Sequence, residues 1–314
     1  MTTPSWQGVY PALLTPFRED DTIDFNMFRH NLDAQLDAGI DGIIIAGSLG
    51  EASTLSNDEK LELLRFSKQV MNRPVPAILN IAEQSTSCAV QAAREAEENG
   101  ADGLMLLPPM RYKADPRETV EYFKAITSSS SLPAMIYNNP YDYKIEVTLD
   151  MFEELANIPS IQAVKESTRD VSNVTRMNNR FGTRFKILCG VDTLALEELA
   201  LGADGWVGGL VDAFPAETVA VYQLMKGGRY QEALAIYRWF LPLLELDIHP
   251  KLVQNIKLAA SRMGISSEYV RAPRLPLEGD ERISVIEIID SAIASRPVIQ
   301  DYLQLIKTQQ AERI

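Results

Sequence analysis

Cysteine and histidine are both scarce in this chain, which has 314 residues and two of each. Cys88 and Cys189 lie far apart in apolar settings, so we predict two reduced core cysteines and no disulfide framework. His30 and His249 belong to no metal-ligand spacing, so we expect no metal centre. A Gly-x-x-x-x-Gly-Lys-Ser/Thr motif and a Gly-x-Gly-x-x-Gly motif after a strand are both absent, which excludes the common phosphate-binding fingerprints.

Positive charge and long apolar segments are also lacking. There are 43 acidic and 30 basic residues, which give a formal net charge of −13 at pH 7. Such a surface repels phosphate backbones and anionic lipid, so we expect neither nucleic-acid nor membrane binding. No apolar run approaches the roughly 18 residues of a transmembrane helix, and Met1–Gln7 do not have the form of a signal peptide. We therefore expect a soluble, cytoplasmic protein.

Short apolar runs do alternate regularly with amphipathic segments. Eight of these runs are predicted strands: Val9–Leu14, Gly42–Ala46, Val75–Asn80, Gly103–Leu107, Ala134–Asn138, Ile161–Lys165, Phe185–Cys189 and Gly205–Gly208. The clearest helical patterns between them are Met27–Ala38, Asp58–Met71, Ser85–Asn99, Pro116–Thr127 and Pro215–Lys226. Strands this apolar favour a parallel sheet covered by helices, so we predict an α/β protein with a (β/α)8 TIM barrel. A doubly wound open sheet is the alternative.

One local sequence recurs at the ends of predicted helices, at Gly39–Gly42, Gly100–Gly103 and Gly202–Gly205. The first glycine of each suits the left-handed position that ends a helix, and the Asp-Gly pair turns the chain into a strand. The gaps between the three copies fit about two and about four βα units. Chance recurrence of common turn residues is the alternative.

Beyond the eighth predicted strand the pattern becomes wholly helical. The predicted helices are Tyr230–Leu246, Pro250–Met263, Asp280–Ala294 and Pro297–Ala311, with a proline-rich link at Arg271–Leu277. We therefore predict a catalytic barrel at residues 1–228 and a C-terminal helical subdomain at residues 229–314.

Lys165 is the first candidate for chemistry, because active sites of such barrels lie at the C-terminal ends of the strands. Of the eleven lysines, it alone ends an apolar strand pattern. Burial among apolar groups disfavours the ammonium form and lowers the pKa of a lysine, and a neutral amine can attack a ketone. The alternative is a strand-end lysine that pairs with an acid such as Glu166.

Other segments at predicted strand ends carry polar groups. Tyr137 ends the fifth predicted strand, where a phenol can relay protons, or can equally be a core tyrosine. The Gly47–Glu51 loop exposes backbone amides that can hold a carboxylate, and Ser48 adds a hydroxyl donor. Gly208 can let a ligand approach the eighth strand, or can simply relieve packing.

Together these segments resemble the dihydrodipicolinate synthase / N-acetylneuraminate lyase family. The matching pieces are Gly8–Phe17, Gly47–Glu51, Tyr137–Pro140 and Val164–Ser167. The resemblance implies a (β/α)8 barrel, a C-terminal helical subdomain and a homotetramer. It also implies that no cofactor is needed, because Lys165 forms the Schiff base itself, with Tyr137 as the acid/base relay.

The resemblance further implies where a 2-oxo acid would bind. Ser48, with the backbone amides of Ser48 and Leu49, would hold its carboxylate. The remaining residues that we expect around the substrate are Gly47, Gly50, Arg111, Asn139 and Gly208.

Some positions depart from the family pattern. Synthases that condense pyruvate with aspartate semialdehyde carry an arginine where this chain has Asp142, which would repel the carboxylate of the aldehyde. They have a threonine at the position of Leu49 and a tyrosine pair at the positions of Met110 and Arg111. These differences argue against the synthase activity of the lysine pathway. Leu49 also departs from the sialic-acid lyase pattern.

The serine followed by a bulky apolar residue, with Tyr-Asn-x-Pro-Tyr, is similar to a branch that acts on a cyclic imino acid. That branch converts 4-hydroxy-1-pyrroline-2-carboxylate into 2-oxoglutarate semialdehyde and ammonia in hydroxyproline breakdown. We therefore predict a 1-pyrroline-4-hydroxy-2-carboxylate deaminase. The alternatives are an aldolase or dehydratase of a 2-keto-3-deoxy acid, a 4-hydroxy-tetrahydrodipicolinate synthase, and a non-catalytic 2-oxo-acid sensor.

Overall fold

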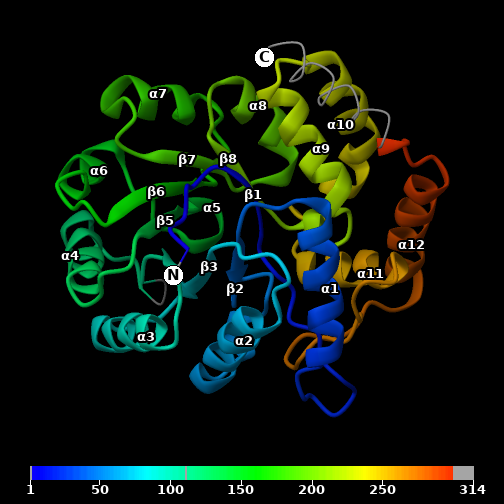
Figure 1. Cartoon of the computed structure of the whole chain (residues 1–314), viewed down its shortest axis with the longest axis horizontal. Helices are drawn as coiled ribbons and strands as arrows, with labels where there is room; N and C mark the ends of the chain where they lie inside the picture. The colour runs from blue at the N-terminus through cyan, green and yellow to red at the C-terminus, as the bar shows by residue number, and fades with distance from the viewer. Residues whose placement is uncertain (1, 110–111, 300–314) are drawn as a thin grey trace.

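Eight parallel strands form the centre of the computed structural model, which describes residues 2–109 and 112–299 (Figure 1). They are β1 (Gly8–Pro11), β2 (Ile43–Ile45), β3 (Ala77–Ile81), β4 (Gly103–Leu106), β5 (Ala134–Asn138), β6 (Ile161–Glu166), β7 (Lys186–Cys189) and β8 (Gly205–Gly208). Strands β2 to β8 pair with one another in sequence order, and β1 pairs with β8. A further parallel bridge joins Ala12 to Ile44, so the sheet closes almost completely. The predicted barrel is confirmed, and the open sheet is wrong.

Helices surround the barrel. They are α1 (Phe25–Ala38), α2 (Asn57–Val70), α3 (Thr86–Glu98), α4 (Pro116–Thr127), α5 (Pro140–Tyr143), α6 (Leu149–Leu155), α7 (Ser172–Phe181), α8 (Ala195–Ala200) and α9 (Pro215–Lys226), with short 3-10 turns at Ala52–Thr54, Asp192–Leu194 and Leu210–Asp212. Local sequence fixes where several begin. Ser56 with Glu59, and Asp115 with Glu118, form reciprocal capping boxes at α2 and α4. Such caps satisfy amides that the first helical turn leaves unpaired.

The recurring glycine motif has two structural roles. Gly39, Gly100 and Gly202 have φ angles of 92°, 84° and 103°, the left-handed conformation that ends a helix cheaply only for glycine. The aspartate two residues later accepts a hydrogen bond from the backbone amide at or near the start of a neighbouring strand: Asp41 from Val9, Asp102 from Ala77, and Asp204 from Ile187. The motif therefore ends a helix and also ties together the ends of the barrel at which the strands begin.

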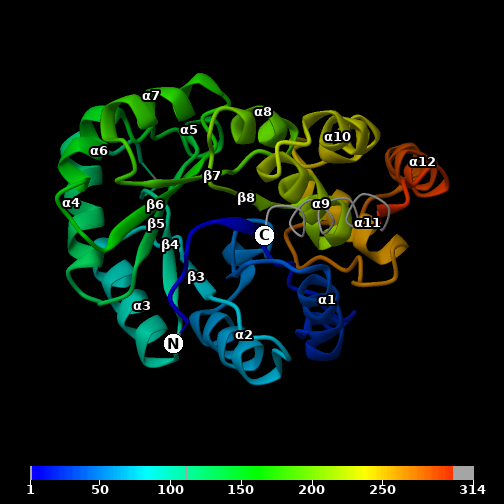
Figure 2. The same cartoon turned by 45° about the horizontal axis from the view of Figure 1, so that its top comes forward.

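The C-terminal helices lie together on one flank of the barrel, beside α9 and α1 (Figures 1 and 2). They are α10 (Tyr230–Leu244), α11 (Leu252–Arg262) and α12 (Gly279–Ala294). Most of the predicted helix Pro297–Ala311 falls outside the described residues. The predicted domain boundary at residue 228 stays a prediction. The helices on either side of it, α9 and α10, pack closely on each other.

Two further expectations concern surfaces. Cys189 is buried, but Cys88 is exposed in the first turn of α3, so the prediction of two core cysteines is wrong for Cys88. The apolar residues near it in the sequence belong to the inward face of that helix. None of the helices within residues 2–109 and 112–299 is both long and apolar enough to cross a bilayer.

Candidate active site

A cavity of about 270 Å³ opens at the C-terminal ends of the strands. Its wall includes Lys165 and Tyr137 on neighbouring strands, Ser48 from the loop after β2, and Gly208 at the end of β8. One side comes from the segment after α10, beginning at Asp247. The barrel topology thus brings together groups that are far apart in the sequence.

Lys165 is buried, with 7% of its surface exposed, and faces this cavity. Its strand neighbour is Tyr137, whose ring centroid lies 4.0 Å from the lysine Nζ. Gly190 makes room for the side chain, because a Cβ there would come within 2.7 Å of the lysine Cγ. Burial lowers the pKa of Lys165 below its usual range. Within the described residues, no carboxylate forms an ion pair with this lysine.

Glu166 does not supply the missing counter-ion. Successive residues of a strand point to opposite faces, so its side chain leaves the barrel interior. Its carboxylate accepts hydrogen bonds from the Thr168 amide and the Asn173 side chain, both at 2.7 Å. The alternative of a Lys165–Glu166 pair is therefore wrong.

Tyr137 is a buried phenol that stays protonated at neutral pH. Burial raises its pKa to about 12. The side-chain amide of Asn139 donates one hydrogen bond to the Tyr137 hydroxyl at 3.1 Å and another to the Asp142 carboxylate at 2.7 Å. Because the hydroxyl oxygen accepts from Asn139, the phenolic proton can be directed to a group in the cavity.

Ser48 lies at the cavity mouth, and its hydroxyl forms a short hydrogen bond with the Tyr143 hydroxyl. The Tyr143 ring meets the Tyr137 ring edge-on, with centroids 5.5 Å apart. Among the described residues, nothing accepts a hydrogen bond from the backbone amides of Ser48 and Leu49. Two free amides beside a hydroxyl can bind a carboxylate.

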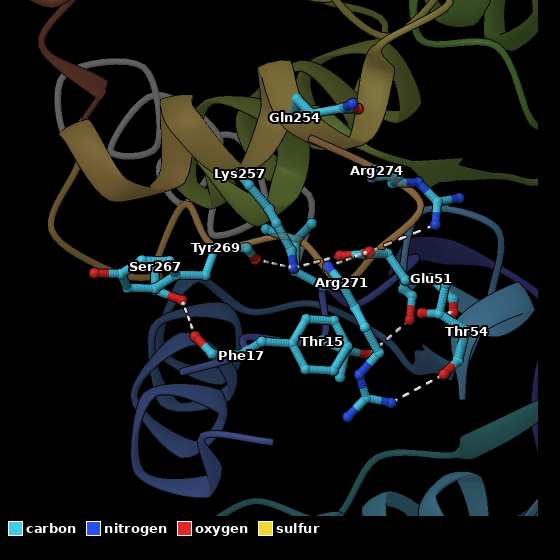
Figure 3. Close-up of polar contacts among 12 residues, drawn as sticks. Thr15, Phe17, Glu51, Thr54, Gln254, Lys257, Ser267, Tyr269, Arg271 and Arg274 are labelled. Carbon is cyan, nitrogen blue, oxygen red and sulfur yellow. Dashed lines mark hydrogen bonds and ion pairs between the residues drawn. The ribbon is translucent and has the colours of Figure 1, made fainter. Parts of the chain in front are cut away.

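Glu51 ties this loop to the C-terminal region (Figure 3). Its side chain is fully buried and accepts hydrogen bonds from the Lys257 ammonium at 2.5 Å and the Arg271 amide at 3.2 Å. Arg274 approaches the same carboxylate at 3.5 Å. All three partners come from α11 and the segment after it, so the C-terminal region holds the loop that carries Ser48.

The predicted site residues fall into three groups. Lys165, Tyr137, Ser48, Gly47, Leu49, Asn139 and Gly208 all line the cavity. Gly50 is not on the cavity wall, and a Cβ there would come within 2.6 Å of the Leu13 carbonyl, so it serves packing. Arg111 lies outside the described residues.

Several polar residues of the cavity wall are not among the predicted site residues. They include Tyr143, Ser167, Arg169, Asp247, Gln254 and Arg274. Tyr143 and Arg169 follow strand ends within a few residues, so the barrel rule could have found them. Asp247 and Arg274 come from the helical C-terminal region, where no periodicity or motif marks a residue that faces the barrel mouth.

The described residues of this site do not form a recognisable set of metal ligands. In the part of the chain that the structure describes, no group of three histidine, cysteine or acidic residues is placed to hold an ion. The cavity wall contributes an amine, phenols, hydroxyls and carboxyls. Such groups suit proton transfer and amine addition.

Comparison with known proteins identifies the lineage. The family model described as the dihydrodipicolinate synthetase family matches residues 5–292. The chain belongs to this family. The 4-hydroxy-tetrahydrodipicolinate synthase of Bacillus velezensis is 30% identical over 282 residues, which cover 90% of this chain and 98% of the relative. The synthase of Exiguobacterium sibiricum is 32% identical over 275 residues, or 87% of this chain and 92% of the relative.

Solved structures agree with the family assignment. The 4-hydroxy-tetrahydrodipicolinate synthase of Methylacidiphilum fumariolicum superposes with a TM-score of 0.86 at 28% identity, over 96% of this chain and 98% of the other. A dihydrodipicolinate synthase of Bacillus anthracis gives 0.88 at 27% identity, over 93% and 99%. Members of the family are class I Schiff-base lyases, and this chain is an enzyme of that type.

Proposed function

We propose that this enzyme is a 1-pyrroline-4-hydroxy-2-carboxylate deaminase that uses Lys165 as its Schiff-base amine. The observation that carries the proposal is the Asp142 carboxylate on the cavity wall. An anionic group there disfavours a second substrate with its own carboxylate, whereas a cyclic imino acid needs no second substrate. Asn139 holds Asp142 through its side-chain amide.

Substrate binding begins at the loop after β2. The free amides of Ser48 and Leu49, with the Ser48 hydroxyl, receive the carboxylate on C2 of the ring. This places C2 toward Lys165. Because burial lowers the pKa of Lys165, a larger fraction of the amine is neutral than in water, and the neutral form is the nucleophile.

The chemistry then runs through one covalent adduct. The Lys165 amine adds to the protonated ring C=N, a proton passes from the lysine nitrogen to the ring nitrogen, and the C2–N ring bond breaks to leave an iminium on Lys165. Loss of a C3 proton gives an enamine, which expels the C4 hydroxyl as water. The Tyr137 phenol, with its pKa of about 12, is a proton donor to that leaving hydroxyl. Tautomerisation places an imine at C5, and water hydrolyses both imines to give 2-oxoglutarate semialdehyde and ammonia.

A second candidate is an aldolase or dehydratase of a 2-keto-3-deoxy acid. Two arginines on the cavity wall favour it, because they could bind the polar tail of a longer acid. Both already have partners, however. Arg169 stacks on the Tyr141 ring at 3.4 Å, and Arg274 approaches Glu51 at 3.5 Å.

A substrate panel with separate ammonia and pyruvate assays tests the proposal. We expect ammonia from 4-hydroxy-1-pyrroline-2-carboxylate in step with 2-oxoglutarate semialdehyde. Brisk cleavage or dehydration of 2-keto-3-deoxy acids without ammonia from the pyrroline would favour the second candidate. Condensation of pyruvate with aspartate semialdehyde would favour the activity in the relatives' names. Ligand binding without turnover of any panel member would favour a sensor.

Assembly and location belong to the same proposal. We expect a homotetramer in the cytoplasm, as the resemblance and composition suggest. Light scattering after size-exclusion chromatography measures the mass, which should be four times that of the 35.0 kDa chain. A monomer of full activity would contradict this expectation.

A further inference from the structure

Two carboxylic acids, Asp192 and Asp247, interact electrostatically with Lys165, and the fold holds them differently. Asp192 is fully occupied by donors. Its carboxylate accepts hydrogen bonds from the Trp206 indole at 2.8 Å, the Gly209 amide at 3.1 Å and the Leu210 amide at 2.8 Å. It is buried and is not part of the cavity wall. Asp192 therefore fastens the turn after β8.

Asp247 lines the cavity itself. The backbone amide of Asp192 donates to its carboxyl group, and no side chain among the described residues donates to it. Gly209 leaves room for it, because a Cβ at that position would come within 2.5 Å of the Asp247 Oδ1. The fold thus keeps a space for this carboxyl and leaves it short of donors.

Such a carboxyl suits a cation placed in the cavity. A partly desolvated carboxylate gains most from a charge-assisted hydrogen bond, and a protonated one can supply a proton. Desolvation raises the pKa of Asp247, which is half-buried at the cavity wall. Lys165 is one positive group within its field, and a nitrogen of the substrate is the other that the reaction offers.

We propose that Asp247 binds the ring nitrogen of the substrate as that nitrogen leaves C2 and becomes an ammonium group. When the C2–N bond breaks, the nitrogen departs as a neutral amine. The Asp247 carboxyl gives it one proton and remains beside it as a carboxylate. This inference rests on the proposed function and narrows it to acids that carry a basic nitrogen.

Two ligands of equal chain length separate this role from others. 1-Pyrroline-2-carboxylate forms a Schiff base with a free amine at C5, whereas 2-oxopentanoate forms the same Schiff base without nitrogen. Neither has a C4 hydroxyl to lose, so both stop at the adduct. Borohydride quenching after short incubations, with mass spectrometry of the Lys165 peptide, gives the rate of each adduct.

We expect the parent to form both adducts. Asp247→Asn should slow the pyrroline adduct by about 30-fold or more relative to the 2-oxopentanoate adduct, a ratio from which any change in the neutral fraction of Lys165 cancels. Asp247→Glu should recover part of the pyrroline rate. The matched control Asp280→Asn, which changes an exposed acid of α12, should leave both rates unchanged.

Equal losses with both ligands would overturn the inference, because Asp247 would then act on Lys165 and not on the substrate nitrogen. No loss with the pyrroline, or no pyrroline adduct in the parent, would overturn it as well. Failure of the proposed function gives a different result. The parent would then release no ammonia from the hydroxylated pyrroline while the adduct of 1-pyrroline-2-carboxylate still depended on Asp247.

Discussion

Lys165 and Lys257 are both buried lysines, but the fold gives them opposite tasks. Lys257 is fully buried against the equally buried Glu51 and also donates to the Tyr269 carbonyl at 2.6 Å. Lys165 faces the cavity, and the described residues give it no ion-pair partner. Burial lowers the pKa of both, that of Lys257 to about 8.

The difference lies in what surrounds each amine. Hydrogen bonds to the Glu51 carboxylate and the Tyr269 carbonyl occupy two of the three donors of Lys257 and make it a structural tie (Figure 3). Lys165 has an aromatic face beside it and, among the described residues, no carboxylate within ion-pairing distance, so its nitrogen stays available to a ligand. A buried lysine becomes a nucleophile when the fold withholds its counter-ion.

Replacement of Lys165 should give the largest effect. We expect Lys165→Arg, which keeps the charge but cannot form the imine, to reduce turnover by about 10⁴-fold or more. Ammonia release and borohydride trapping measure the loss. Lys257→Arg is the matched control, and it should still trap a 2-oxo acid on Lys165. An adduct on any other lysine of the parent would break the comparison.

The next effect is on stability. Lys257→Met should lower the free energy of unfolding by about 3–5 kcal/mol, because it leaves the buried Glu51 carboxylate without its closest cation. Urea denaturation followed by circular dichroism measures the change. The double variant Lys257→Met/Glu51→Leu should recover part of the loss, since it removes both charges. A larger loss in the double variant would mean that the pair is not the source of the effect.

Much of the barrel mouth around Lys165 was predictable from the sequence, whereas little of the C-terminal region around Lys257 was. Lys165 and Tyr137 stand at the ends of apolar strands, where barrel geometry dictates that side chains meet. Lys257 and Asp247 belong to the helical C-terminal region, whose patterns indicate which faces are apolar but not where the helices dock on the barrel. Cys88 shows the same limit, because apolar neighbours in sequence need not share its face of a helix.

Tyr137→Phe should have a smaller effect than loss of the amine. Without the phenolic proton we expect ammonia release to fall by about 10²–10³-fold, since general acid catalysis contributes about that much. Trapping of pyruvate on Lys165 should fall less than dehydration does. Tyr143→Phe, which removes the hydroxyl bonded to Ser48, is the matched comparison. Equal effects of both variants on every step would argue against a separate role for Tyr137.

The smallest expected effect concerns how adduct formation on Lys165 depends on pH. Because the pKa of Lys165 lies below its ordinary value of 10.5, the acid limb of adduct formation should be centred below that pH. Adduct formation with pyruvate, quenched with borohydride after short incubations, should rise by up to about tenfold per pH unit on the acid limb.

Variants should shift this limb selectively. The pKa of Lys165 is raised by four neighbouring groups, Tyr143, Asp247, Asp192 and Cys189, so Asp247→Asn should move the limb toward lower pH. Lys257→Met should leave the limb where it is, because Lys257 is committed to Glu51. A limb centred at 10.5 in the parent would mean that burial does not depress the pKa of Lys165, and the contrast between the two lysines would then rest on contacts alone.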